Sequence, residues 1–292
     1  MKKTLAALCC CGLFLTAPEN SFCDQTIYAI KTPSPPVIDG NADDISWQGT
    51  KNINTHDNIA DININLKAVY DDKKIYFLVV FPDIDESRSH KTWIWNAKNN
   101  GYEIGPDRED TFIFKWNMEN KQASLSIHSD NPHIADIWFW KADRTDPLGF
   151  ADDKMDYFSE KFMLNTMELI SNAGKHMFLK RTPDKGYPAY QTTLPVDYAG
   201  DKIPHYSSQK PIGSRADVSA KGIWSKNEWT IEFSRKLKTG NLDDLQFNIE
   251  DIYYFGVSRY EIAGIKPNPE ISQPLYGAGD TSELLTLKFI SK

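Results

Sequence analysis

Cysteine is almost absent from this chain of 292 residues, and its four copies lie at positions 9, 10, 11 and 23. Beyond position 23 the sequence therefore excludes a disulfide, a thiolate metal site and a thioether bond to a cofactor. A chain of this length can bury enough apolar surface to fold without disulfides, so their absence is compatible with export.

Long hydrophobic runs are also lacking. The longest, residues 5–15, is much shorter than the ~20 residues that a membrane-spanning helix needs. It follows the lysines at positions 2 and 3 and precedes a polar stretch ending at Cys23, which is typical of a secretory signal peptide. A lipoprotein signal is less favoured, because the bulky Phe22 precedes Cys23. We predict a signal peptide over residues 1–23 and a periplasmic or secreted mature chain without a transmembrane segment.

No block of Lys and Arg residues interrupts the sequence, and the formal net charge is −7. Removal of the two lysines and one glutamate of the predicted signal peptide changes this charge to −8. An acidic surface repels phosphate backbones and anionic lipid, so nucleic acid and membrane surfaces are not expected partners. A neutral or basic partner is expected instead.

Sequence motifs of common enzymes are missing as well. We find no Ser-His-Asp order, no phosphate-binding glycine loop and no His-x-x-x-His zinc pair. A binding or electron-transfer protein is therefore expected rather than an enzyme.

Strand patterns dominate the rest of the chain. Residues 63–70 alternate with a period of two, and a polar turn joins them to the apolar residues 75–81, which predicts a hairpin. Further strands are predicted at residues 111–116, 223–224, 229–233, 246–249, 253–257 and 284–289.

Helical patterns are scarce in comparison. Only residues 159–171 have a weak helical pattern, and residues 183–215, rich in Pro, Gly, Tyr and Ser, predict a long structured loop. Many short strands without alternating helices favour an all-β fold. We predict an antiparallel β-sandwich with long loops and one or two short helices, forming a single domain over residues 24–292.

Four segments carry a resemblance to known proteins. They are PVIDG at residues 36–40, DREDTF at 107–112, DIWFWKADRTDPLGFADD at 136–153 and GSRADV at 213–218. The first two resemble segments of carbohydrate-binding and DOMON-type sandwiches. The third and fourth resemble the haem-binding domains related to ethylbenzene dehydrogenase, which are similar to cytochrome subunits of periplasmic molybdenum enzymes.

The resemblance implies a haem protein. Several members of that family attach haem through a Cys-x-x-Cys-His motif, but the corresponding stretch here has Ser124 and Ile127 in the cysteine positions and keeps only His128. Covalent c-type haem is therefore excluded, and the expected cofactor is non-covalent haem b. The implied function is electron transfer to or from a periplasmic redox partner, with a molybdenum oxidoreductase as one candidate.

Three residues are candidate axial ligands of that haem. His128 keeps the family position, Lys266 follows the predicted strand at 253–257, and Met118 offers a thioether. Each has a plainer interpretation: a surface histidine in a polar loop, a solvated lysine, and a core methionine that fills a gap. If haem binds, we expect His128 on one side of the iron, with Lys266 or Met118 opposite it.

Four more residues are candidates for the haem pocket. Alternation places Trp138 and Trp140 on one face of their strand, where they line a pocket or belong to the core. Arg144 and Arg215 either bind the haem propionates or form ion pairs. The ion-pair candidates are Asp136, Asp152, Asp153 and Asp217.

Two questions remain open at the level of the sequence. The acidic residues Asp107, Glu109, Asp110, Asp152 and Asp153 can be read as calcium ligands or, since their spacing fits no defined loop, as solvated turns. The chain can also be a module that binds carbohydrate or another ligand without haem, or a structural partner that has lost its haem.

Overall fold

The computed structural model describes residues 25–259 and 280–291. The predicted signal peptide and Lys266 lie outside these residues. Within the described residues, no helix is long and apolar enough to cross a membrane. The helical elements are α1 (Ile45–Gln48) and the 3₁₀ turns η1 (Asp146–Leu148) and η2 (Ser214–Ala216). The strands are β1 (Gln25–Lys31), β2 (Ile53–Asp57), β3 (Ile62–Tyr70), β4 (Lys74–Pro82), β5 (Trp93–Asn96), β6 (Gly101–Ile104), β7 (Thr111–Asn117), β8 (His133–Lys141), β9 (Asp152–Ser159), β10 (Met167–Ile170), β11 (His176–Pro183), β12 (Tyr190–Thr192), β13 (Lys202–Ile203), β14 (Tyr206–Ser208), β15 (Ser219–Ser225), β16 (Glu228–Lys236), β17 (Tyr253–Ser258) and β18 (Leu285–Ile290).

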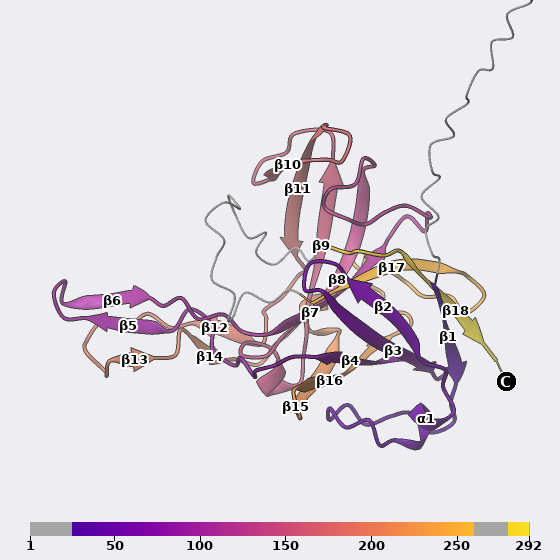
Figure 1. Cartoon of the computed structure of the whole chain (residues 1–292), viewed down its shortest axis with the longest axis horizontal. Coiled ribbons are helices and arrows are strands. Elements are labelled where there is room, and N and C mark those ends of the chain that lie inside the picture. Colours follow the sequence, from indigo (N-terminus) through magenta and orange to yellow (C-terminus); the bar gives the residue numbers. More distant parts are fainter. Residues whose placement is uncertain (1–24, 260–279, 292) are drawn as a thin grey trace, which may run out of the picture.

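Thirteen strands form one sheet that folds back on itself (Figure 1). Its order is β10-β11-β9-β8-β7-β17-β18-β1-β3-β4-β16-β15, with β2 beside β3. Although β4 and β7 are far apart in this order, Phe77 of β4 lies 4.9 Å from Phe114 of β7, ring centre to ring centre. Trp140 of β8 and Trp229 of β16 likewise meet at 4.8 Å. The two halves therefore face each other across one core, which confirms the predicted all-β sandwich.

The pairing is antiparallel with one exception. β1 runs parallel to both β18 and β3, so it joins the two halves of the sheet. The sequence analysis did not identify β1. The purely antiparallel prediction is wrong at this strand, because its pairing depends on the far end of the chain rather than on a local turn.

The predicted strands are confirmed except for one. The hairpins β3–β4 and β15–β16 pair in register, and β7, β17 and β18 form where expected. Residues 246–249 form no strand, because Phe247 packs its ring on Trp116 while its backbone follows a turn. The weak helix predicted at 159–171 is also wrong: its second part is β10, which pairs with β11.

Residues 36–40, the first of the segments with a family resemblance, form a loop around a buried carboxylate. Backbone N–H groups of Asp39 and Gly40 donate to Glu232 Oε2 at 3.0 and 2.9 Å. The indole Nε1 of Trp47 donates to Glu232 Oε1 at 2.8 Å. The segment thus connects the start of the chain to β16 and satisfies a buried charge.

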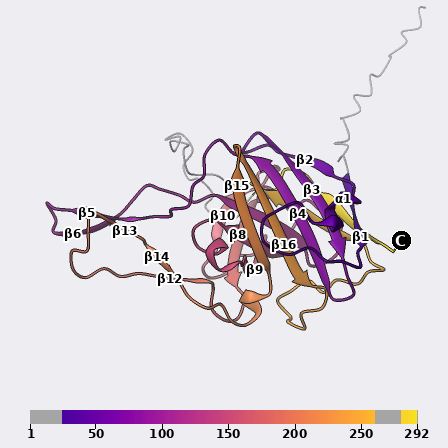
Figure 2. The same ribbon diagram turned by 90° about the horizontal axis from the view of Figure 1, so that it is seen from below.

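An arm extends from the sandwich, as both views show (Figures 1 and 2). It contains a three-stranded sheet in the order β13-β5-β6, together with the separate ladder β12–β14. The arm is built from residues 87–110 and 183–215, so the long structured loop predicted for the second segment is confirmed. At its base, Tyr190 of β12 contacts Lys141 of β8 and brings the arm against the sheet.

Candidate functional site

A pocket of about 360 Å³ lies where the base of the arm meets strands β7, β8, β9 and β11. Phe139 and Lys141 face it from β8, whereas the alternate residues Trp138 and Trp140 belong to the core. The lining residues are His90, Lys91, Arg108, Glu109, Thr111, Phe139, Lys141, Arg144, Asp152, Lys154, Arg181, Pro183, Tyr190 and Arg215. We refer to this site as the cationic pocket.

The charge of the cationic pocket is opposite in sign to the net charge of the chain. Seven Lys and Arg side chains line the cationic pocket, against the two carboxylates Glu109 and Asp152. The whole sequence, by contrast, has a formal charge of −7. A concave site of one sign attracts ligands of the other sign, and does so more strongly where water is excluded.

Arg144 is fixed from three sides. Its Nε donates to Glu109 Oε1, while Glu109 Oε2 accepts the backbone N–H groups of Asp143 and Arg144 at 2.8 and 3.0 Å. The guanidinium also lies 5.2 Å from the ring centres of both Tyr190 and Tyr206. Because the two rings are themselves in edge contact, with centres 5.4 Å apart, Arg144 packs beside the pair, which limits its rotamer freedom while it keeps its charge.

Asp152 connects the strands to the arm. It accepts hydrogen bonds from Lys141 Nζ, from Tyr190 Oη at 2.9 Å and from Arg215 Nε at 3.3 Å. Although burial by itself raises the pKa of Asp152, the charges of Lys141 and Arg215 hold it well below its usual range. Asp152 is therefore ionised, and it positions two of the cations of the pocket.

Two lysines lie on either side of one aromatic ring. The Nζ atoms of Lys141 and Lys154 are each 4.5 Å from the ring centre of Phe139. Burial lowers the pKa of Lys141 to about 8 and that of Lys154 to about 7. These two ammonium groups are poorly solvated, so an anion beside them is favoured.

His90 lines the same pocket as a neutral imidazole. Burial, followed by the positive charges of Arg144 and Lys91, lowers its pKa to about 2. A neutral imidazole keeps a lone pair for a hydrogen bond or a metal. The sequence analysis did not single out His90.

Of the predicted site residues, Arg144 and Arg215 come together. Both line the cationic pocket. Arg215 forms the ion pair with Asp152 that was expected as an alternative, whereas Arg144 pairs with Glu109, which was not among its expected partners.

Trp138 and Trp140 lie in the core and not at a ligand surface. Both are fully buried, and Trp138 packs on Trp116 with ring centres 5.2 Å apart. The core alternative is confirmed, and the prediction that they line a pocket is wrong. The physical reason is that the facing half of the sheet covers this side of β8, leaving Phe139 and Lys141 for a ligand.

His128 and Met118 lie away from the cationic pocket. Thr111 at the start of β7 lines the pocket, whereas Met118 follows the end of that strand, about 20 Å further along at the usual strand rise. His128 Nδ1 lies 3.0 Å from the carbonyl oxygen of Ile170 in β10. Neither residue lines the cationic pocket, and the ligation of a haem iron by His128 with Lys266 or Met118 stays a prediction. The third candidate, Lys266, lies outside the described residues.

The acidic residues that were read as solvated turns are mostly buried. Asp110 accepts a hydrogen bond from Trp229 Nε1 at 3.0 Å and pairs with Arg259 at 3.1 Å. Glu109, Asp152 and Asp153 are buried too. The solvated-turn interpretation is therefore wrong for these four, because the arm and the second half of the sheet cover them.

Comparison with known families assigns the chain to one of them. The chain matches the ethylbenzene dehydrogenase family over residues 38–264. It belongs to that family. Among solved structures it is similar to a carbohydrate binding module family 9 from Caldicellulosiruptor kristjanssonii in complex with glucose (13% identity, TM-score 0.41, 92% of this chain and 97% of that chain). The same module in complex with cellotriose gives 13% identity, a TM-score of 0.40, and coverage of 92% and 95%. No curated protein matches.

In this member of the ethylbenzene dehydrogenase family, the sequence analysis missed Lys154, Arg181, His90 and Tyr190. Lys154 was detectable in part, because alternation along residues 152–159 puts it on the face opposite Asp153 and Met155. Arg181, His90 and Tyr190 come from β11 and from the arm. No local pattern relates these segments to β8.

Proposed function

We propose that this chain is an extracytoplasmic binding protein whose cationic pocket holds an anionic ligand. The observation that supports this proposal is that seven Lys and Arg side chains, against two carboxylates, line one pocket of an acidic protein. Glu109 and Asp152 are already committed to Arg144, Lys141 and Arg215. The ligand therefore bears carboxylate or phosphate groups, which these cations bind through charge-assisted hydrogen bonds.

The volume and lining suit a small molecule with an apolar part. About 360 Å³ is within the usual range of small-molecule pockets, roughly 300–1,000 Å³. Phe139 provides an apolar floor and belongs to a buried cluster with Ile113, Ala135 and Ile137. Tyr190 adds an aromatic wall.

Haem b is the candidate that the family relationship favours. Its two propionates match Arg144 and Arg215, and its ring requires apolar contacts such as Phe139. His90, a neutral imidazole on the wall, is the described side chain suited to the iron. Bound haem supplies one-electron redox chemistry, and the chain would then exchange electrons with a partner protein outside the cytoplasm.

An acidic saccharide is the second candidate. The observation in its favour is the pair of rings, Tyr190 and Tyr206, beside Arg144, since sugar rings stack on aromatic faces. In this case the chain is a ligand-binding module without a metal. Both candidates share carboxylate recognition by the cationic pocket.

The test is a titration of residues 24–292 with haemin, trigalacturonate and the neutral cellotriose. Absorption follows haemin, and calorimetry follows the sugars. A Soret band that sharpens on reduction supports the haem protein, and binding of trigalacturonate without cellotriose supports the acidic saccharide. If only cellotriose binds, or none of the three, the proposal is wrong.

A further inference from the structure

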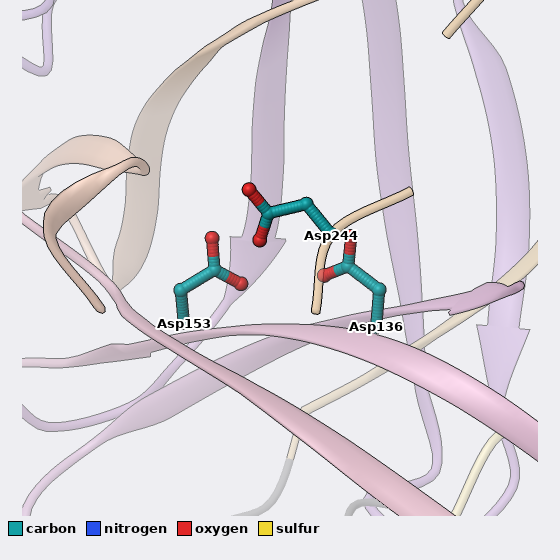
Figure 3. Close-up of side chains that lie close together, drawn as sticks. All are labelled: Asp136, Asp153 and Asp244. Atoms are coloured by element: carbon teal, nitrogen blue, oxygen red, sulfur yellow. The ribbon is translucent and has the colours of Figure 1, made fainter. Parts of the chain in front are cut away.

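A second charged cluster lies on the core side of β8 and β9 and has the opposite sign. The carboxylates of Asp136, Asp153 and Asp244 are turned toward one another (Figure 3). One oxygen from each lies within 4.8 Å of the others, and the same holds for Asp184, Asp243 and Asp244. Asp244 therefore belongs to two sets of potential metal ligands.

One arginine accounts for only part of this charge. Arg235 Nη1 donates to Asp136 Oδ2 at 2.5 Å, and the backbone N–H of Leu245 donates to the same oxygen at 2.8 Å. Arg235 Nη1 is 3.8 Å from Asp153 and 3.9 Å from Asp244, beyond hydrogen-bond distance. Arg235 is therefore hydrogen-bonded to Asp136 and shared at longer range with Asp153 and Asp244, so one positive charge faces three carboxylates.

Three of these carboxylates, those of Asp153, Asp184 and Asp244, have no hydrogen-bond partner among the described residues. Both side-chain oxygens of Asp153 and of Asp184 are buried and unpartnered, and these residues are 0% and 5% exposed. Burying an ionised carboxylate without a partner is very costly, so such groups are normally paired, protonated or bound to a metal. Asp153 and Asp184 are neighbours, since the backbone N–H of Asp184 donates to the Asp153 carbonyl at 3.3 Å.

We propose that Asp184, Asp243 and Asp244 bind a calcium ion, with the Asp153 carboxylate facing the same site. All the ligand atoms are carboxylate oxygens, which calcium prefers. Because the oxygens already lie within 4.8 Å of one another, small side-chain movements can bring each to about 2.4 Å from one ion, a calcium–oxygen distance. Magnesium is less suitable, because it requires shorter distances and a stricter octahedral geometry.

The surroundings position these ligands. Ser214 Oγ donates to Asp243 Oδ1 at 2.8 Å, and the backbone N–H of Lys185 approaches Asp243 Oδ2 at 3.4 Å. Asp243 is half-buried, so it marks the side from which an ion can enter. The site joins the end of β11, the 243–244 turn and η2.

The electrostatics of the cluster favour a bound cation. Burial, and then the charges of Asp136 and Asp243, raise the pKa of Asp184 to about 8. Burial also raises the pKa of Asp244 to about 7, although Arg235 opposes this, and that of Asp153 well above its usual range. A divalent cation removes this repulsion, and so do protons, which is the competing explanation that an experiment must separate.

The experiment is thermal unfolding of residues 24–292 at pH 8 in EDTA, with calcium or with magnesium. We expect calcium to raise Tm by several degrees and magnesium to have less effect. Asp184→Asn should abolish the calcium shift, yet its Tm in EDTA should equal or exceed that of the wild type, because one repelling charge is gone. The control Asp197→Asn, at an exposed position, should keep the calcium shift.

Terbium luminescence gives a readout that does not depend on stability. Trp138 lies near the cluster, since its ring centre is 4.7 Å from Arg235 Cζ, and it can therefore sensitise a bound terbium ion. We expect luminescence that calcium displaces and that Asp184→Asn loses. If the wild type shows neither a calcium shift nor luminescence, or if Asp184→Asn retains both, the carboxylates are protonated and the proposal is wrong.

Discussion

Protonation of Lys154 should make the affinity for the ligand depend on pH. Burial lowers its pKa to about 7, so it is mostly neutral above pH 7 and mostly charged below. An anion binds the charged form, and affinity should therefore fall as pH rises, by up to about tenfold per unit above pH 7. The measurement is a titration between pH 6 and 9 with whichever of haemin and trigalacturonate binds.

Lys154→Met should weaken binding at pH 6 and remove the part of this pH dependence near pH 7, while the part due to Lys141, whose pKa is about 8, remains. Lys226→Met, at an exposed turn, is the control and should behave like the wild type. An unchanged pH profile in Lys154→Met would show that another group is responsible.

Gly40 provides a test of the loop around Glu232. Its φ is +88°, and an added Cβ would lie 2.9 Å from Ile223 Cγ1 and 3.1 Å from the Ile223 backbone nitrogen. Gly174 has a similar φ of +79°, but nothing lies within 4 Å of its Cβ position. Gly174→Ala should therefore cost only the conformational strain, about 1–2 kcal/mol, and Gly40→Ala clearly more. Urea unfolding measures both, and equal losses would contradict the close packing of this loop.

At the level of elements, the arm completes the cationic pocket. Tyr190 of β12 and Tyr206 of β14 each have a ring centre 5.2 Å from the Arg144 guanidinium. Replacing both tyrosines by alanine should release Arg144 and weaken ligand binding about 2–30-fold, the range expected for such contacts. The sheet does not depend on them, so far-UV circular dichroism should not change. Loss of the sheet signal would mean that the arm is required for folding.

Strand β8 shows which features of the site the sequence predicts and which it does not. Its alternation correctly separates Trp138 and Trp140 from Phe139 and Lys141, because a strand turns successive side chains to opposite faces. It cannot tell which face meets the core and which meets a ligand. That depends on the arm and on the other half of the sheet, which are distant in sequence.

The same reasoning explains which site residues could be found. Arg144 and Arg215 lie in segments with a family resemblance and were identified, although Trp138 and Trp140 were assigned to the wrong surface. His90 and Tyr190 come from the arm, whose loops have no periodic pattern to place them. The parallel strand β1 was missed for a similar reason, since its partner β18 lies at the other end of the chain.

At the scale of the whole molecule, folding should not require an oxidant. If the signal peptide is cleaved after Cys23, the mature chain begins at Asp24 and contains no cysteine. Its stability then comes from the buried sandwich core, so dithiothreitol should leave the urea midpoint unchanged. Intact mass of the exported protein is the companion measurement. A shifted midpoint, or a mass that includes Cys23, would contradict the predicted cleavage site.

The central claim is that Arg144, Arg215 and their neighbours bind an anion in the cationic pocket. The most direct test compares haemin and trigalacturonate binding to the wild type, to Arg144→Gln/Arg215→Gln and to Lys51→Gln/Lys226→Gln, a control that removes the same charge from exposed positions. We predict that at least one of the two ligands binds the wild type and the control equally, and that the arginine double variant, still folded by circular dichroism, binds it at least tenfold more weakly. Equal binding by the arginine variant and the control, or no binding of either ligand to the wild type, would contradict the claim.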